Sequence, residues 1–259
     1  MITAADIAVF RDRGLLRLPA AIPADAVAQA KSAVFAVLER AGLWADGAWR
    51  LEGAERPRWP ALGKAPAAFK GRAVTDALEA LVPEALRPDL SRLAGAAVGT
   101  AGGLHRSQVL WTLPNADAWT LPAILWHTDV PRAEEPGCPG VQVFSFLAPV
   151  APGAGGTLVA AGSHRLLNDQ GALRSKDIKA RLRALPPFAR LMDPAHPGRP
   201  GGPGPGPFGE ADGVPIEVVE LTGAPGDLWL MDMRALHTAA PNASRAPRLM
   251  MTWRFLREG

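Results

Sequence analysis

The pattern of apolar and polar positions divides the chain into a helical first third and a strand-rich remainder. Thr3 and Asp6 form a helix-start signature, a hydroxyl cap followed three positions later by an acidic residue. We expect this helix to end at Gly14, and an amphipathic helix to run from Pro23 to about Ala41. A short strand is expected over 15–18, and further helices over 75–82 and 88–98.

From about residue 107 the pattern changes to short apolar runs separated by glycine and proline. The expected strands are 107–113, 122–126, 141–148, 157–161, 215–221, 227–231 and 248–256. Short strands with regular turn signals are typical of a sandwich or barrel. We therefore predict one mainly β domain over 1–259. Its double-stranded β-helix (jelly-roll, cupin-like) core over about 101–259 packs against the helical N-terminal third, about 1–100.

A long segment, residues 162–214, separates the expected strands 157–161 and 215–221. Residues 169–185 have helical composition, whereas residues 194–209 form a tract rich in proline and glycine. Proline lacks the backbone donor and fixes its own dihedral, so we expect a mobile loop over 194–209. The pattern leaves open whether this loop covers a cleft or is a surface insertion.

Composition excludes several classes of function. With 48% hydrophobic and 20% charged residues, the chain has the balance of a globular protein. The net charge is only +3 and the basic residues are scattered, which argues against nucleic acid as a partner. Neither a long apolar span nor a secretory start is present, so no membrane association is expected. The single cysteine, Cys138, cannot form an internal disulfide, which predicts a reducing, cytoplasmic location.

The candidate chemistry centres on His127 and Asp129, which follow the apolar run 122–126. If that run is a strand, alternation of side chains places both residues on one face. His237, just past another apolar strand, is the candidate third ligand. Two imidazoles and one carboxylate suit non-heme iron(II) with open coordination positions. For either histidine alone, a hydrogen-bonded residue near the core is the simpler interpretation, but the three together favour a metal site.

Arg248 begins the last strand, which is otherwise almost wholly apolar. A buried arginine needs an anionic partner, and its planar guanidinium matches a carboxylate. A dicarboxylate co-substrate that chelates the metal at one end would supply this partner. The alternatives are a pairing of Arg248 with a surface carboxylate, and Arg245 as the arginine that binds the co-substrate.

Several motifs occur in an order that resembles one family across nearly the whole chain. They are Trp126-His127-Thr128-Asp129, Gly155-Gly156-Thr157-Leu158 with Gly162-Ser163-His164, Gly226-Asp227 through His237, and Pro241-Asn242-Ala243-Ser244 followed by Arg248. This ordered set resembles the phytanoyl-CoA hydroxylase-like (PhyH) family of iron(II)- and 2-oxoglutarate-dependent oxygenases.

The resemblance implies roles for individual residues. The His127, Asp129 and His237 side chains would hold Fe(II), and Arg248 would bind the distal carboxylate of 2-oxoglutarate. Two further contacts to 2-oxoglutarate are expected from Gln108 and Thr157. The implied reaction consumes O2, hydroxylates an unactivated carbon of a small molecule, and releases succinate and CO2. Because halogenating relatives carry a small residue in place of the carboxylate, Asp129 favours oxygenation.

The sequence departs from the family pattern at two places. Many relatives carry a serine where this chain has Ala239, and a tryptophan in the region where Phe144 and Phe146 stand. The pocket wall, and therefore the substrate, stays open. The sequence also leaves the oligomeric state open. Two alternatives also remain: a cupin-fold metalloenzyme that does not use 2-oxoglutarate, and a non-catalytic ligand-binding relative.

Overall fold

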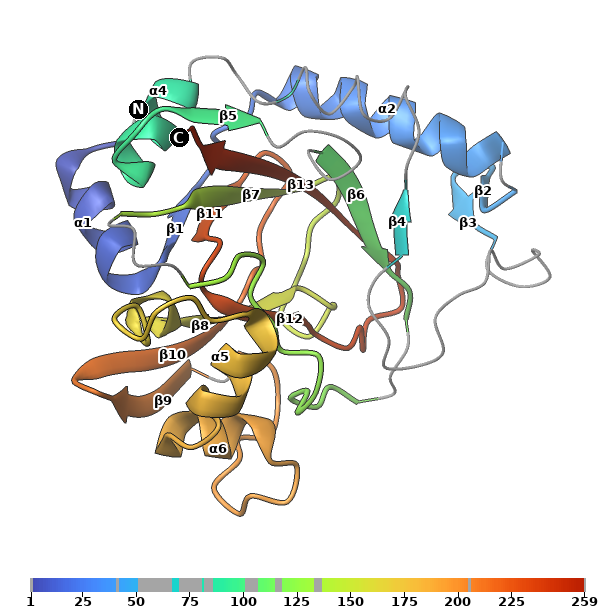
Figure 1. The fold of residues 1–259 in the computed structure, drawn as a ribbon. Coiled ribbons are helices and arrows are strands. Elements are labelled where there is room, and N and C mark those ends of the chain that lie inside the picture. Colours follow the sequence, from blue (N-terminus) through green and yellow to red (C-terminus); the bar gives the residue numbers. More distant parts are fainter. Residues whose placement is uncertain are drawn as a thin grey trace.

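The computed structural model describes residues 2–40, 42–50, 67–69, 81, 86–100, 107–114, 118–132, 137–204 and 206–258. Two antiparallel sheets face each other, and helices cover their outer sides (Figure 1). This arrangement confirms the predicted mainly β fold with flanking helices. Within the described part of the chain, no helix combines the length and apolar character needed to cross a membrane.

The larger sheet has the strand order β1-β11-β7-β13-β6-β4, and β5 pairs with β13 off this path. Its strands come from both halves of the chain, and three of them belong to the N-terminal third. The strands are β1 Leu15–Leu18, β4 Ala67–Phe69, β5 Val98–Thr100, β6 Ser107–Thr112, β7 Gly140–Phe146, β11 Leu228–Asp232 and β13 Arg248–Arg257.

The smaller sheet has the order β12-β8-β10-β9. Its strands are β8 Thr157–Ala161, β9 Gly206–Ala211, β10 Val214–Glu220 and β12 Leu236–Ala239. A separate two-stranded ribbon pairs β2 (Trp44–Ala45) with β3 (Ala48–Trp49).

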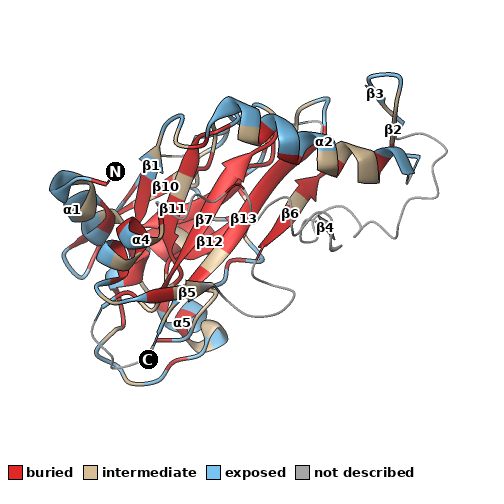
Figure 2. Cartoon of the chain, turned by 90° about the horizontal axis from the view of Figure 1, so that it is seen from above, coloured by how far each residue is buried: buried red, intermediate tan, exposed pale blue. Residues whose placement is uncertain are grey.

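The helices shield the outer faces of both sheets. In α1, the Thr3 hydroxyl accepts from the Asp6 amide at 3.1 Å, and the Asp6 carboxylate accepts from the Thr3 amide at 2.8 Å. Gly14 then ends α1 with φ 66°, as predicted. The long α2 lies over the larger sheet with its outer side exposed, as Figure 2 shows. The helices are α1 Ala4–Arg13, α2 Ala24–Arg40, α4 Leu86–Ala94, α5 Ser175–Leu182 and α6 Pro186–Met192.

In strand β13, successive side chains point alternately toward the helices outside the sheet and toward the interior between the two sheets. Leu249, Met251 and Trp253 belong to the apolar cluster that includes α1, α2 and α4 residues. Met250 belongs to a different cluster, which is formed between the two sheets. The residues that lie an even number of positions from Met250 therefore face the interior of the jelly roll: Arg248, Thr252 and Arg254.

The elements predicted between the expected strands 157–161 and 215–221 need correction. Helix α5 covers only part of the expected 169–185 helix, and α6 follows it where no helix was predicted. The expected loop over 194–209 is wrong at its end, because β9 begins at Gly206. Pro207 pairs with Glu217 on β10, and this is tolerated because β9 is an edge strand whose other side needs no donor.

Two helices predicted in the N-terminal third had different outcomes. Helix α4 ends at Ala94, four residues before the predicted end, and Val98 instead begins β5. The helix expected over 75–82 lies outside the described residues, apart from Leu81.

Candidate metal centre

His127 and His237 face each other across an isolated antiparallel bridge. The His127 amide donates to the His237 carbonyl at 3.0 Å, and the His237 amide donates back at 2.9 Å. This reciprocal pair fixes both backbones, and the two imidazole ring centroids lie 4.3 Å apart. The bridge therefore brings together two histidines that are far apart in sequence.

Asp129 completes the group from the same segment as His127. Its amide donates to the Met233 carbonyl at 3.2 Å, which ties the segment to the turn before β12. Asp129 Oδ2 lies 3.7 Å from His237 Nε2, and Asp129 Oδ1 lies 4.0 Å from His127 Nε2. One ligand atom from each of the three residues lies within 4.8 Å of the others, so all three can reach a common ion.

Both imidazoles are held in the form that can bind a metal. Each Nδ1 faces a backbone carbonyl two residues earlier, that of Leu125 at 2.9 Å and that of Ala235 at 3.0 Å. Because a carbonyl only accepts, each Nδ1 carries a proton, which leaves Nε2 as the ring atom that can face a metal. Burial lowers the pKa of His237 to about 4, against the opposing effect of Asp129, so His237 is neutral at pH 7.

The Asp129 carboxylate supplies a second indication that a cation fits. Its Oδ2 atom is buried and has no hydrogen-bond partner among the described residues. A buried carboxylate oxygen without a partner is unfavourable unless something binds it. Two imidazoles beside such an oxygen form a donor set that suits a divalent transition metal.

The segment before His127 is a turn, so the predicted strand over 122–126 is wrong. Trp126 Nε1 donates to the Pro122 carbonyl at 2.9 Å, and Leu125 has φ 67°, in the left-handed region. A residue other than glycine rarely adopts this φ, and doing so stores strain. In this conformation the Leu125 carbonyl faces His127 Nδ1. His127 and Asp129 thus converge through a strained turn and an isolated bridge, without the regular strand that the sequence indicated.

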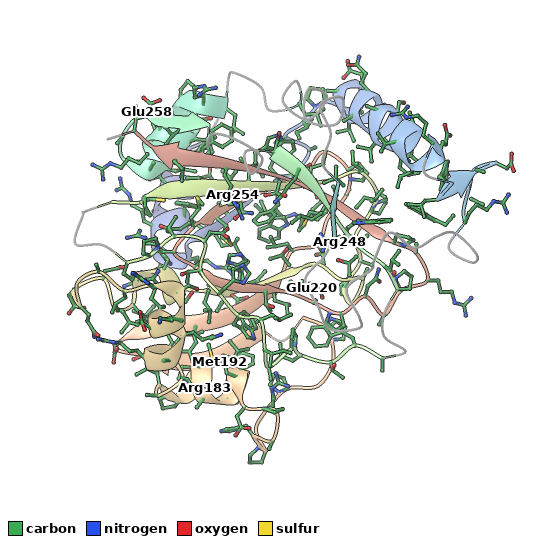
Figure 3. All side chains as sticks on the ribbon, turned by 45° about the vertical axis from the view of Figure 1, so that its right-hand side comes forward. Arg183, Met192, Glu220, Arg248, Arg254 and Glu258 are labelled. Carbon is green, nitrogen blue, oxygen red and sulfur yellow. The ribbon has the colours of Figure 1, made fainter. Side chains whose placement is uncertain are left out.

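Arg248, at the start of β13, is buried at 3% exposure. Its Nη2 donates to the Thr112 hydroxyl at 2.6 Å and its Nη1 to the Leu110 carbonyl at 3.5 Å, whereas Nε has no partner among the described residues. Burial lowers the pKa of Arg248 to about 10, and nearby Glu220 opposes this shift (Figure 3). Arg248 makes no ion pair with a described residue, so a buried cation retains spare donors.

Glu220 does not neutralise Arg248 at contact distance. Its two carboxylate oxygens accept from the Gly153 amide at 2.9 Å and the Gly156 amide at 3.2 Å. Burial raises the pKa of Glu220, and these two hydrogen bonds oppose the rise. Glu220 thus holds the glycine-rich entry to β8, which leaves the spare donors of Arg248 for another anion.

The other predicted site residues lie on the inner faces of the sheets. Gln108 pairs in register with Thr252 of β13, and Thr157 on β8 pairs with Ala239 of β12. Both Gln108 and Thr157 are buried. Their contact with a co-substrate stays a prediction. Arg245, the competing arginine, is exposed in the turn before β13.

Sequence reasoning missed Arg132, which is completely buried. Its Nε, Nη1 and Nη2 donate to the carbonyls of Leu166, Arg234 and Ser163 at 3.0, 2.8 and 3.0 Å. These bonds tie the segment after Asp129 to the Gly-Ser-His turn and to the turn before β12. No sequence motif indicates this role, because all three acceptors are backbone carbonyls.

We expect Arg132→Met to destabilise the protein by about 3 kcal/mol, since it removes three charge-assisted bonds and leaves buried carbonyls unpaired. The measurement is urea denaturation of the metal-free protein. Arg165→Met is the matched control, because Arg165 forms a largely exposed ion pair with Asp12 and is expected to change stability by at most about 1 kcal/mol. Equal effects of the two substitutions would contradict the role assigned to Arg132.

Solved structures share this fold across nearly the whole chain. AviO1 from Streptomyces viridochromogenes Tue57 is 20% identical, with a TM-score of 0.60, over 100% of this chain and 97% of AviO1. SnoK, described as a non-heme alpha-ketoglutarate-dependent carbocyclase from nogalamycin biosynthesis, is 17% identical, with a TM-score of 0.58, over 98% of this chain and 84% of SnoK. EctD from S. alaskensis, solved with 2-oxoglutarate and 5-hydroxyectoine, is 20% identical, with a TM-score of 0.59, over 99% of this chain and 76% of EctD.

These likenesses confirm the cupin-like double-stranded β-helix. No curated protein sequence matches the chain. The profile of the family described as phytanoyl-CoA dioxygenase (PhyH) matches residues 10–250, which is most of the chain. The chain therefore belongs to the phytanoyl-CoA dioxygenase (PhyH) family of iron(II)- and 2-oxoglutarate-dependent oxygenases.

Proposed function

We propose that the protein hydroxylates an unactivated carbon of a small organic molecule, using iron(II), 2-oxoglutarate and O2 and releasing succinate and CO2. The observation that carries this proposal is the convergence of His127, Asp129 and His237, whose ligand atoms lie within 4.8 Å of one another. Family membership supports the same chemistry.

In this proposal the two Nε2 atoms and Asp129 Oδ2 hold the metal. The hydrogen bonds at Nδ1 keep both rings oriented, and the bridge between His127 and His237 fixes their separation. Three protein ligands on one side leave the remaining coordination positions for co-substrate and O2. When bound, iron with 2-oxoglutarate supplies the oxidising power that activates O2 toward a C–H bond.

Arg248 binds the distal carboxylate of 2-oxoglutarate in this proposal. Its burial, its spare N–H donors and the lack of an ion pair with a described residue support the assignment. Gln108 and Thr157 are proposed as additional polar contacts, supported by their burial on the inner faces. Ala239 offers no hydroxyl, so Thr157, its register partner, is the nearest alternative on that sheet.

Hydroxylation is the specific outcome proposed among several that structurally similar enzymes carry out. SnoK is described as a carbocyclase, so the shared fold does not fix the final step. The Asp129 carboxylate occupies a position at the metal that halogenation would require for chloride, which favours oxygen transfer. Mass spectrometry of products formed under isotopically labelled O2 distinguishes incorporation of an oxygen atom from cyclisation or epimerisation.

The proposal is tested first by ligand binding and then by turnover. Nickel(II) together with 2-oxoglutarate is expected to raise the melting temperature by about 5–10 °C, the effect of a ligand near 100 times its dissociation constant. With iron(II), ascorbate and a substrate panel, succinate should form only when both O2 and 2-oxoglutarate are present. If nickel(II) raises the melting temperature and 2-oxoglutarate adds no further rise, the protein would be a cupin-fold enzyme that does not use 2-oxoglutarate. If nickel(II) does not raise the melting temperature, the protein would be non-catalytic.

A further inference from the structure

Arg254 lies on the inner face of β13, an even number of residues beyond Arg248 (Figure 3). Its Nη2 donates to Asp129 Oδ1 at 3.1 Å. The Arg254 and Asp129 side chains are only 22% and 10% exposed, so water screens this pair weakly. Among the described residues, no other side chain hydrogen-bonds the Asp129 carboxylate.

This contact makes the two oxygens of Asp129 different. Oδ1 accepts from Arg254, whereas Oδ2 is buried without a hydrogen-bond partner in the described part of the chain. Oδ2 is also the oxygen that lies 3.7 Å from His237 Nε2. One oxygen is therefore held by the protein, and the other is left for a metal.

We infer that Arg254 is a positioning residue that holds Asp129 as a one-oxygen metal ligand and so keeps coordination positions open for 2-oxoglutarate. This inference rests on the proposed function. A freely rotating carboxylate can bind a metal through both oxygens, which would occupy a position that a chelating co-substrate needs. A guanidinium bonded to Oδ1 opposes that rotation, because its planar group fixes the direction of the hydrogen bond.

Sequence alone gives no indication of this role. Arg254 follows Trp253 in an apolar strand near the C-terminus, and an arginine there is most simply an edge residue facing solvent. The contact arises because the segment carrying Asp129 packs against the inner face of β13, which only the folded chain shows.

The test compares Arg254→Met with the wild-type protein by two measurements other than turnover. In the cobalt(II)-loaded protein without 2-oxoglutarate, the visible absorption reports coordination geometry, and we expect it to change in the variant. Under anaerobic conditions with iron(II), the affinity for 2-oxoglutarate should fall about 10- to 100-fold, as metal affinity or activity does when a residue that orients a metal ligand is lost. Metal affinity should fall less than the affinity for 2-oxoglutarate.

Two further variants separate positioning from charge and from folding. Arg254→Lys keeps the positive charge without the planar group, so it should leave the cobalt spectrum largely changed. Arg254→Gln is too short to reach Oδ1 and should behave like Arg254→Met. Arg254→Gln also replaces Arg254→Met if the methionine variant does not fold. Arg40→Met, at an exposed arginine in the last turn of α2, should leave both measurements unchanged.

An unchanged cobalt spectrum in both Arg254→Met and Arg254→Gln overturns the inference, even if 2-oxoglutarate affinity falls, because loss of charge alone would explain that fall. A wild-type protein that binds no metal, or binds metal but not 2-oxoglutarate, overturns the proposed function and the inference with it. Failure of the inference alone is thus distinguishable, since the wild type then binds both ligands normally.

Discussion

Asp129→Ala is expected to lower metal affinity by about 100-fold or more and to abolish metal-dependent formation of succinate. The change removes one of the three converging ligand atoms. This atom, Asp129 Oδ2, is buried and has no hydrogen-bond partner among the described residues. Loss of a residue that merely orients a ligand costs 10- to 100-fold, so loss of the ligand itself should reach at least the upper end of that range. The measurement is calorimetric titration with cobalt(II).

The matched control is Asp25→Ala, which removes an exposed carboxylate from the first turn of α2. This change should leave metal affinity unchanged and reduce stability by at most about 1 kcal/mol. His237→Ala should reproduce the loss seen with Asp129→Ala, because the same ion would lose a different ligand. Wild-type metal affinity in both site variants would rule out the proposed centre.

The grouping of His127, Asp129 and His237 could be predicted from sequence because their chemistry is unusual for their surroundings. A histidine and a carboxylate at close spacing, and a second histidine after an apolar strand, have few simple structural explanations when taken together. The same reasoning predicted that Arg248 is buried and needs a partner; the structure shows its burial, and its role stays a prediction. These inferences depend on residue type and do not require the exact backbone.

The backbone that positions those ligands was harder to predict. The apolar run before His127 looks like a strand, but the hydrogen bond from Trp126 to Pro122 and the positive φ of Leu125 make it a turn. In β9, pairing with β10 at a sheet edge overrides the local preference of proline and glycine for loops. In both places, tertiary contacts decided the conformation against the local pattern.

Arg132 and Arg254 were missed for a related reason. Their partners are backbone carbonyls and a carboxylate contributed by distant segments, and periodicity carries no information about such pairs. By contrast, both ends of the first helix were predicted, because the capping contact between Thr3 and Asp6 and the stop at Gly14 are local signals. Local signals thus predicted local elements, whereas the residues that support the candidate metal centre could be found only in the folded structure.

Arg248→Met is expected to weaken 2-oxoglutarate binding by at least about 30-fold while leaving metal binding unchanged. Loss of one partner of a buried, hydrogen-bonded charge pair costs about 2 kcal/mol or more, and this corresponds to that factor. Arg248 has spare donors and no ion pair with a described residue, so the distal carboxylate is the anion that the variant would lose. The rise in melting temperature with nickel(II) and 2-oxoglutarate should therefore shrink to the rise with nickel(II) alone.

The control ligand is 2-oxopentanoate, which has a methyl group where 2-oxoglutarate has its distal carboxylate. The wild type should prefer 2-oxoglutarate strongly, whereas Arg248→Met should bind the two compounds about equally, because methionine offers no donor to distinguish them. The metal-free variant should be as stable as the wild type or more so, since a buried cation without an ion pair among the described residues is replaced by an apolar side chain of similar length. If the variant kept the wild-type preference for 2-oxoglutarate, the distal carboxylate would have to be bound elsewhere, and exposed Arg245 would become the next residue to test.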